Sequence, residues 1–317
     1  MRALYLDGSR LSPRSDYPAP LPPPGESRVR VSLAGICGTD LELLDGYMGF
    51  RGVPGHEFVG VVDRSSNPTL VGMRVAGEIN AACGRCDFCA ADLGRHCPHR
   101  TVLGILGRDG AFADYLTLPD RNLIPLPASL PDECAVFIEP VAAACEIFEQ
   151  VALARDTKIL VLGDGRLGAI VASVLQAYSY SAVVGGHHAA KLAALAGLGL
   201  KVALEPELAP GFDCVIDCTG NPAGFARAVA LVRPRGRVIL KSTAAGTAPL
   251  NLAPVVISEV NVVGSRCGRF APAVAALEQG LLDPRPLISA RYALDDGLAA
   301  VAAARDPLNF KVLLQVA

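Results

Sequence analysis

The chain has 317 residues, 51% of them hydrophobic, and its 29 Lys and Arg residues nearly balance 31 Asp and Glu residues. A net charge of −2 offers no basic surface to a polyanion, so we expect no nucleic-acid partner. No uninterrupted apolar run reaches the ~18 residues of a membrane span, and the N-terminal residues lack the apolar stretch of a signal peptide. We therefore expect a cytoplasmic protein without membrane contact.

The first part of the chain predicts short strands. Residues 29–37, 57–64 and 73–80 are apolar runs separated by Gly and Pro, and residues 18–25 form a proline-rich loop. Runs of this length and composition are typical of a β-rich domain rather than a helical one. The strand-rich region extends to about residue 135.

Inside this region, four cysteines lie within fifteen residues in the spacing C-x2-C-x2-C-x7-C: Cys83, Cys86, Cys89 and Cys97. Because no secretory signal points to an oxidising compartment, the cluster predicts metal ligation rather than disulfides. Short C-x2-C spacings let successive sulfurs converge on one zinc ion, and four thiolates leave no position open for water or substrate. The loop 83–97 is therefore predicted to hold a structural zinc, and the chemistry must lie elsewhere.

From about residue 136 the pattern changes to an alternation of strands and helices. Four consecutive segments show it: 158–178, 181–199, 212–220 and 226–243. Such alternation is typical of a doubly wound parallel sheet with helices on both faces. A last strand of this sheet is expected near residue 264, after which a helix leads back to strand-like segments.

A glycine pattern lies where the first of these strands meets its helix. Gly163, Gly165 and Gly168 form G-x-G-x-x-G, with Arg166 and Leu167 between the second and third glycines. In this context the first glycine permits a tight turn, the second lets the backbone approach a pyrophosphate, and the third lets the helix pack on the strand. The free N–H groups of the helix N-terminus face the phosphates. The pattern predicts a dinucleotide site.

The end of the second strand bears on the choice of cofactor. Many NAD-binding domains carry an acid there that accepts the ribose hydroxyls, but this chain has Gly186, followed by His187, His188 and Lys191. A small residue leaves room for a 2′-phosphate, which an imidazole or an ammonium could bind. The sequence therefore favours NADP(H) over NAD(H).

Three further fragments stand out: GICGTDLE at 35–42, GVPGHEFVG at 52–60 and FIEPVAAACE at 137–146. Together with the cysteine loop and the glycine pattern, and in this order, they resemble the zinc-containing medium-chain alcohol dehydrogenase superfamily over essentially the whole chain. The E-P pair in the third fragment is most similar to the polyol, glucose and threonine dehydrogenase branches.

The resemblance implies an α/β protein with two domains. A GroES-like, β-rich catalytic domain would comprise residues 1–137 and 281–317, and a Rossmann domain with a doubly wound parallel sheet would comprise residues 138–280. The active site would lie in the cleft between them.

The resemblance also implies a catalytic zinc, with Cys37 and His56 as ligands. The third ligand is either Glu139, where much of the family has a cysteine, or Glu57, which resembles a nearby carboxylate of the family that can approach the metal. Three protein ligands and one open position let zinc act as a Lewis acid on a substrate oxygen.

Further residues gain a role from the same resemblance. Thr39 has the place of the hydroxyl that bonds the substrate oxygen, and a hydroxyl can start a proton relay because it both donates and accepts. Some alcohol dehydrogenases end the relay in a histidine where this chain has Glu42, so either Glu42 or water is the exit. Thr219, Ser242 and Arg266 follow strand ends that face the ligand crevice, and they are predicted to contact the dinucleotide.

The implied activity is the reversible oxidation of a secondary alcohol or polyol to a carbonyl compound with NAD(P). Two zinc ions per subunit are expected, one catalytic and one structural, in a homodimer or homotetramer. Two alternatives remain open: a zinc-independent NADPH reductase of the same fold, and a non-catalytic nucleotide-binding zinc protein.

Overall fold

The chain forms two compact units in the computed structural model, which describes residues 1–8, 10–243 and 249–317. The first unit contains Met1–Glu139 and Ile288–Ala317, and the second contains Pro140–Leu287. Among the helices of the described residues, none has both the length and the apolar character that crossing a membrane requires.

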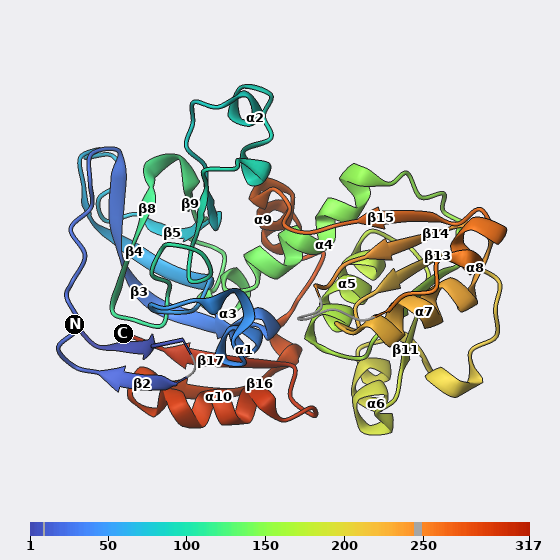
Figure 1. Cartoon of the computed structure of the whole chain (residues 1–317). Helices are drawn as coiled ribbons and strands as arrows, with labels where there is room; N and C mark the ends of the chain where they lie inside the picture. The colour runs from blue at the N-terminus through green and yellow to red at the C-terminus, as the bar shows by residue number, and fades with distance from the viewer. Residues whose placement is uncertain (9, 244–248) are drawn as a thin grey trace. The chain divides into compact units, whose positions relative to one another are not determined.

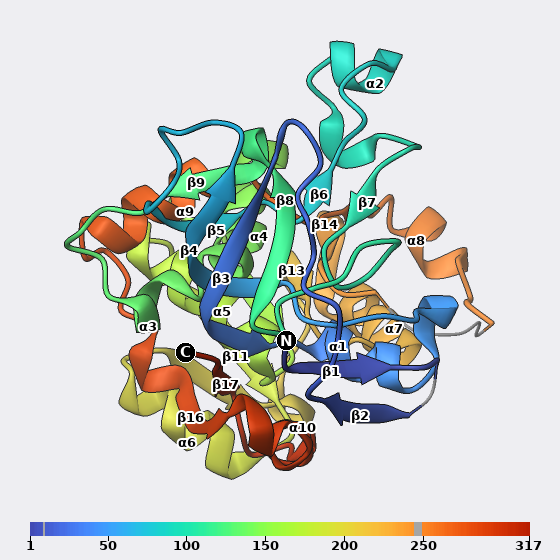
Figure 2. The ribbon, with the colours of Figure 1, turned by 90° about the vertical axis from the view of Figure 1, so that its left-hand side faces the viewer.

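A seven-stranded sheet forms the framework of the first unit. Its path runs β16-β17-β3-β4-β5-β9, and β8 pairs with the first residues of β3 on the side opposite to β4 (Figure 2). The strands are β3 (Glu26–Ile36), β4 (Glu57–Ser65), β5 (Arg74–Gly77), β8 (Tyr115–Pro119), β9 (Leu123–Pro125), β16 (Ile288–Ala293) and β17 (Lys311–Gln315). Val29, Val31 and Leu33 alternate along β3 and are at most 2% exposed, because alternate side chains of a strand point to the same face of the sheet.

Shorter elements complete the first unit. They are β1 (Ala3–Leu6), β2 (Leu11–Arg14), β6 (Asn80–Ala81), β7 (Thr101–Val102), α1 (Gly38–Leu44), α2 (Asp87–Ala90), α3 (Asp132–Ala135) and α10 (Gly297–Arg305). Both ends of the chain belong to this unit (Figure 1). The Arg2 guanidinium donates a hydrogen bond of 2.7 Å to the carbonyl oxygen of Val316.

Two pairings of β3 matter for the site. Gly35 near the end of β3 lies opposite Glu57 at the start of β4, and Ile36 lies opposite Val312 of β17. Antiparallel pairing therefore brings the segment after β3, the start of β4 and the start of β17 to the same edge of the sheet.

The second unit is built on a six-stranded parallel sheet in the order β12-β11-β10-β13-β14-β15. The strands are β10 (Ile159–Leu162), β11 (Ala182–Gly186), β12 (Lys201–Leu204), β13 (Phe212–Asp217), β14 (Val232–Leu240) and β15 (Asn261–Gly264). In chain order this is the 3-2-1-4-5-6 arrangement of a dinucleotide-binding fold, which agrees with the predicted doubly wound sheet. The four residues of β10 are at most 3% exposed, as expected of a central strand covered on both faces.

The helices of this unit follow the strands in turn. They are α5 (Arg166–Ala177), α6 (Ala189–Gly197), α7 (Pro222–Leu231), α8 (Ala253–Ile257) and α9 (Phe270–Glu278), while α4 (Ile138–Gln150) begins at the boundary between the units. Since a ligand binds outside the carboxyl ends of parallel strands, the segments that follow β10, β11, β13 and β14 are the ones to search for the cofactor site.

Candidate metal centres and dinucleotide site

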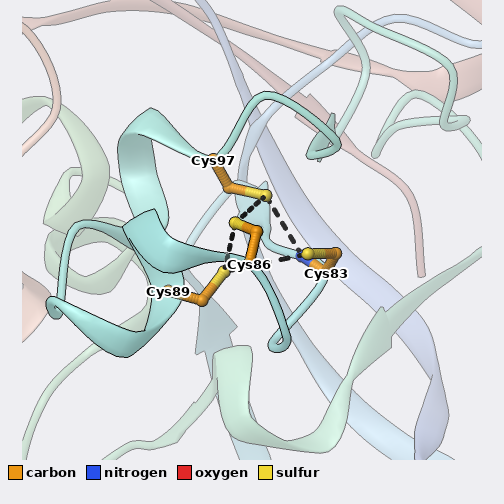
Figure 3. A group of neighbouring side chains, drawn as sticks. All are labelled: Cys83, Cys86, Cys89 and Cys97. Atoms are coloured by element: carbon orange, nitrogen blue, oxygen red, sulfur yellow. Dashed lines mark hydrogen bonds between the residues drawn. The ribbon is translucent and has the colours of Figure 1, made fainter.

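The four cysteines of loop 83–97 point toward one another (Figure 3). The sulfur atoms of Cys86 and Cys89 lie 3.5 Å apart, those of Cys86 and Cys97 lie 3.6 Å apart, and those of Cys83 and Cys89 lie 3.9 Å apart. Four sulfurs at ~2.3 Å from one zinc ion in a tetrahedron lie about 3.8 Å from each other. The loop therefore has the spacing that a zinc tetrathiolate needs.

The acidity of these thiols is consistent with a cation site. Mainly because the backbone N–H of Arg85 bonds to its sulfur, the pKa of Cys83 is lowered to about 6, so it is largely ionised at neutral pH. A backbone hydrogen bond from Cys89 also lowers the pKa of Cys86, but desolvation and the neighbouring thiols outweigh it and raise that pKa to about 11. The cluster thus resists collecting four negative charges until a cation balances them.

Replacing Cys97, which is fully buried, by serine is expected to remove this zinc. A hydroxyl is a poor substitute for a thiolate, and binding a structural zinc contributes on the order of 10 kcal/mol in small zinc-dependent peptides. We expect one zinc ion fewer per subunit by elemental analysis and rapid proteolytic cleavage within loop 83–97. Cys214→Ala, a buried cysteine of the second unit, is the control. An unchanged zinc content in Cys97→Ser would contradict the assignment.

A second group of possible metal ligands lies at the edge of the large sheet. Cys37, His56 and Glu57 each offer one ligand atom, and these atoms lie within 4.8 Å of one another. Cys37 immediately precedes helix α1, and the other two lie at the start of β4, so the pairing of β3 with β4 brings them together. Glu139, at the start of α4, is not a member of this group.

Glu57 is completely buried, and its two carboxylate oxygens differ in their surroundings. Oε2 accepts a hydrogen bond of 2.5 Å from the ammonium of Lys311, which is 3% exposed, whereas Oε1 is buried without a hydrogen-bond partner. A side chain at Gly35 would collide with Oε2, so the glycine makes room for this carboxylate. A buried carboxylate oxygen without a partner is costly unless a cation completes its surroundings, and the donor set therefore fits a zinc ion.

Asp40 contacts two members of this group, Cys37 and His56, and it is not among the site residues predicted from the sequence. Its Oδ2 accepts from the backbone N–H of Cys37 at 2.8 Å, and its Oδ1 accepts from the N–H of Gly55 at 3.1 Å. Oδ1 also lies 3.2 Å from Nδ1 of His56, so the negative charge favours the ring tautomer with its proton on Nδ1 and the lone pair on Nε2. The signal for Asp40 was its position one helical turn after Cys37.

Burial alone would lower the pKa of His56, but the charges of Asp40 and Cys37 outweigh it and raise that pKa well above the ordinary value. The surroundings of this imidazole are thus arranged to stabilise a positive charge next to it. A metal cation that replaces the proton on the imidazole is stabilised by the same negative charges.

Thr39 and Glu42 lie one turn apart on helix α1, directly after Cys37. Both side chains are half-buried. Oε2 of Glu42 is buried without a hydrogen-bond partner, and burial, followed by the charge of Asp45, raises the pKa of Glu42 above its ordinary value. A carboxyl with a raised pKa is suited to exchanging protons near neutral pH.

The glycine pattern in the second unit has the local geometry that a dinucleotide turn needs. A side chain at Gly168 would lie 1.9 Å from the carbonyl oxygen of Gly163, so only glycine lets α5 pack on the turn. At Gly165 an added Cβ would meet nothing within 4 Å, so the backbone borders open space at the N-terminus of α5. Open space beside free N–H groups is what a pyrophosphate requires.

The end of β11 differs from the sequence-based expectation. A Cβ added to Gly186 would lie 2.3 to 2.5 Å from the carboxylate and Cβ of Asp164, so the room expected beside this glycine is filled. Asp164 accepts hydrogen bonds from the backbone N–H of His188 at 2.8 Å and contacts its Nδ1 at 3.1 Å. The His188 side chain is 44% exposed and His187 is exposed, whereas Lys191 is buried.

The remaining predicted contacts lie after the carboxyl ends of β13, β14 and β15. The N–H and hydroxyl of Thr219 donate to Oδ1 of Asp217, and Oγ of Ser242 accepts from the N–H of Gly220 at 2.9 Å. The carbonyl oxygen of Arg266 accepts from the ammonium of Lys241 at 2.6 Å. These bonds fix the backbone at the strand ends, and contact of Thr219, Ser242 and Arg266 with a dinucleotide stays a prediction.

Comparison with known proteins identifies the class. Residues 23–128 match the family described as alcohol dehydrogenase GroES-like domain, and residues 167–279 match the family described as zinc-binding dehydrogenase. The L-threonine 3-dehydrogenase of Streptomyces coelicolor is 31% identical, over 95% of this chain and 94% of the relative. The chain therefore belongs to the zinc-containing medium-chain dehydrogenase superfamily, and it is an oxidoreductase that acts on CH–OH groups.

Two solved structures share the fold over the whole chain. The alcohol dehydrogenase TADH from Thermus sp. ATN1 has a TM-score of 0.91 and 27% identity, with 100% of each chain covered. The alcohol dehydrogenase rspB from Escherichia coli CFT073, complexed with NADH, has a TM-score of 0.90 and 26% identity, with 100% of this chain and 99% of that chain covered. The predicted family and fold class are thus confirmed.

Proposed function

We propose that the protein is a zinc-dependent dehydrogenase that transfers a hydride reversibly between a secondary alcohol or polyol and the nicotinamide of NAD(P). The observation that carries this proposal is the group of half-buried Cys37 and buried His56 and Glu57, whose ligand atoms lie within 4.8 Å of one another in a member of a dehydrogenase family. The Streptomyces relative is a threonine dehydrogenase, and the rspB structure contains NADH, which supports both the substrate class and the cofactor.

We assign two zinc ions to each subunit. Four thiolates of loop 83–97 would hold the structural ion, and Cys37, His56 and Glu57 would hold the catalytic one, with Glu139 as the alternative third ligand. When bound in the second group, zinc supplies a Lewis acid that polarises the substrate oxygen.

The side chains around this group have distinct tasks. Asp40 orients His56, and Lys311 holds one oxygen of Glu57 so that the other faces away from the ammonium. The hydroxyl of Thr39 bonds the substrate oxygen, accepts its proton during alcohol oxidation and gives up its own hydroxyl proton in the same step. Glu42, one turn further along α1, receives that proton and releases it to solvent.

Replacing Glu42 by glutamine tests this proton exit. Because only the ionised carboxylate can accept a proton, and because burial raises its pKa, alcohol oxidation should decline as the pH falls through that raised pKa. Glu42→Gln should lower kcat on the order of 10²-fold and remove this limb of the pH profile. Asp45→Asn removes the neighbouring negative charge and should move the limb to lower pH without lowering the plateau. An unchanged profile in Glu42→Gln would make water the exit.

The proposed function as a whole is tested by a screen of alcohols, polyols and hydroxy amino acids with both cofactors, followed at 340 nm, together with a zinc count. We expect turnover and two zinc ions per subunit. Turnover that survives selective removal of one ion would favour a zinc-independent reductase, and binding of cofactor without any turnover would favour a non-catalytic protein. The preference for NADP(H) predicted from Gly186 is decided by the same screen.

We also propose a homo-oligomer, a homodimer or homotetramer, in the cytoplasm. Strand β15 is an edge of the parallel sheet, and Val262 on it is 41% exposed. Helix α8 directly precedes β15 in the chain (Figure 1). Its residues Val256 and Ile257 are 74% and 80% exposed. An unpaired edge next to exposed apolar side chains is a surface that another chain can cover. Light scattering on the purified protein tests the proposed assembly.

A further inference from the structure

The carboxylate of Asp164 lies where a dinucleotide-binding domain usually has an acid from a different position in the chain. Asp164 is the second residue of the glycine pattern, in the turn after β10. The three atoms nearest to a Cβ on Gly186 are all side-chain atoms of Asp164, at 2.3, 2.4 and 2.5 Å. The carboxylate therefore occupies the space in which a side chain of residue 186 would begin, at the carboxyl end of β11.

This carboxylate is held in place and kept ionised. Both of its oxygens lie 3.1 Å from Nδ1 of His188, and Oδ2 also accepts from the backbone N–H of that residue. Burial alone would raise the pKa of Asp164, but these hydrogen bonds and the charges of His188 and Lys191 outweigh it, so the pKa is lowered. Because a carboxylate only accepts hydrogen bonds, the ring proton of His188 is on Nδ1.

An ionised acid at the end of the second strand has a definite chemical preference. It accepts hydrogen bonds from the adenosine ribose hydroxyls of NAD(H), and it repels the 2′-phosphate of NADP(H). We propose that Asp164 is the ribose-recognising acid of this enzyme, supplied by the phosphate-binding turn instead of by residue 186. This proposal rests on the nicotinamide cofactor of the proposed function. The cofactor that follows is NAD(H), the opposite of the preference drawn from the sequence.

The nearby basic groups do not reverse this preference. His188 and Lys191 are the residues on which a 2′-phosphate site would depend, and both already interact with Asp164. A phosphate placed among them would be repelled by the carboxylate of Asp164. A ribose hydroxyl, which is uncharged, would donate a hydrogen bond to that carboxylate without repulsion. His187, which is exposed at the same turn, can turn toward solvent.

Two fragments of the cofactors test the inference on the intact, zinc-loaded protein without any alcohol substrate. Adenosine 5′-monophosphate and adenosine 2′,5′-bisphosphate differ only in the 2′-phosphate, and calorimetric titration gives the Kd of each. We expect the wild type to bind the monophosphate at least about tenfold more tightly, since a hydrogen bond to a charged acceptor changes affinity by roughly that factor or more. In Asp164→Gly the preference should disappear or reverse.

A transfer of the carboxylate separates recognition from a structural role. The variant Asp164→Gly, Gly186→Asp moves the acid from the turn to the strand, into the space that the first substitution opens. Recovery of the tight monophosphate binding supports the inference. Asp283→Asn, an exposed acid of the same unit, is the matched control and should bind as the wild type does.

Three results would overturn the inference. They are tighter binding of the bisphosphate by the wild type, an unchanged preference in Asp164→Gly, and no recovery in the transfer variant when its circular dichroism and Tm match those of the single variant. If neither fragment binds to the wild type, the cofactor assignment itself fails and the inference fails with it. If the wild type binds the fragments as expected but oxidises no alcohol, that result counts only against the proposed catalysis.

Discussion

Replacing Cys37 by serine is expected to reduce alcohol oxidation on the order of a thousandfold and to lower the zinc content from two ions per subunit to one. A Lewis acid stabilises the charge that develops on the substrate oxygen by several kcal/mol, and each 1.4 kcal/mol corresponds to about a factor of ten in rate. Cys37 also directly precedes the helix that carries Thr39, so the same residue links the metal group to the proton relay.

The control for this variant is Cys134→Ala, because Cys134 is a buried cysteine of the same unit outside both groups of possible ligands. Steady-state rates, elemental analysis and Tm are measured on both variants. A Cys37→Ser protein that is folded, has lost one zinc and still turns over at the wild-type rate would rule out zinc-dependent catalysis. A variant that keeps both ions would show that the remaining donors suffice.

Replacing Lys311 by methionine should destabilise the metal-free protein by about 3–5 kcal/mol, because removing one partner of a buried ion pair leaves the other charge uncompensated. The pair is well suited to this test, since Glu57 is fully buried and Lys311 nearly so, with the ammonium 5.5 Å from the ring centre of Phe137. The same substitution should destabilise the zinc-loaded protein less, since a bound cation balances the charge of Glu57.

Urea unfolding of chelator-treated and zinc-loaded protein measures both effects. In the double variant Glu57→Gln, Lys311→Met neither charge remains, so most of the lost stability should return. Arg305→Gln breaks an ion pair with Asp45 whose side chains are 44% and 62% exposed, and it should cost at most ~1 kcal/mol. Equal losses of stability in Lys311→Met and Arg305→Gln would show that the buried ion pair contributes no more stability than the exposed one.

The features that the sequence predicted correctly are those that local patterns determine. The glycine pattern sits between a strand and a helix because Gly168 must allow a close approach to Gly163, and such a requirement is visible in three residues. Apolar runs separated by Gly and Pro likewise mark strands wherever they are buried. Four thiols within fifteen residues have the short C-x2-C spacings typical of one metal site, and their sulfur atoms do lie within 4.8 Å of one another.

The features that the sequence did not predict depend on distant pairings. Lys311 reaches Glu57 across 254 residues, because β17 returns to lie beside β3. The carboxylate of Asp164 cannot be predicted from its chain position, because only the fold places it in the space beside Gly186. The role of Asp40 likewise depends on Gly55 and His56, which the fold brings next to its carboxylate.

The sheet of the first unit has a consequence for how the protein is made. Strand β17 lies between β16 and β3, so a nascent chain that has emerged as far as Glu139 still lacks two neighbouring strands and the ammonium beside Glu57. All six strands of the parallel sheet, by contrast, are translated before residue 288. The nucleotide-binding half can thus mature on the ribosome, whereas the metal-binding half is completed only after its closing segment leaves the exit tunnel.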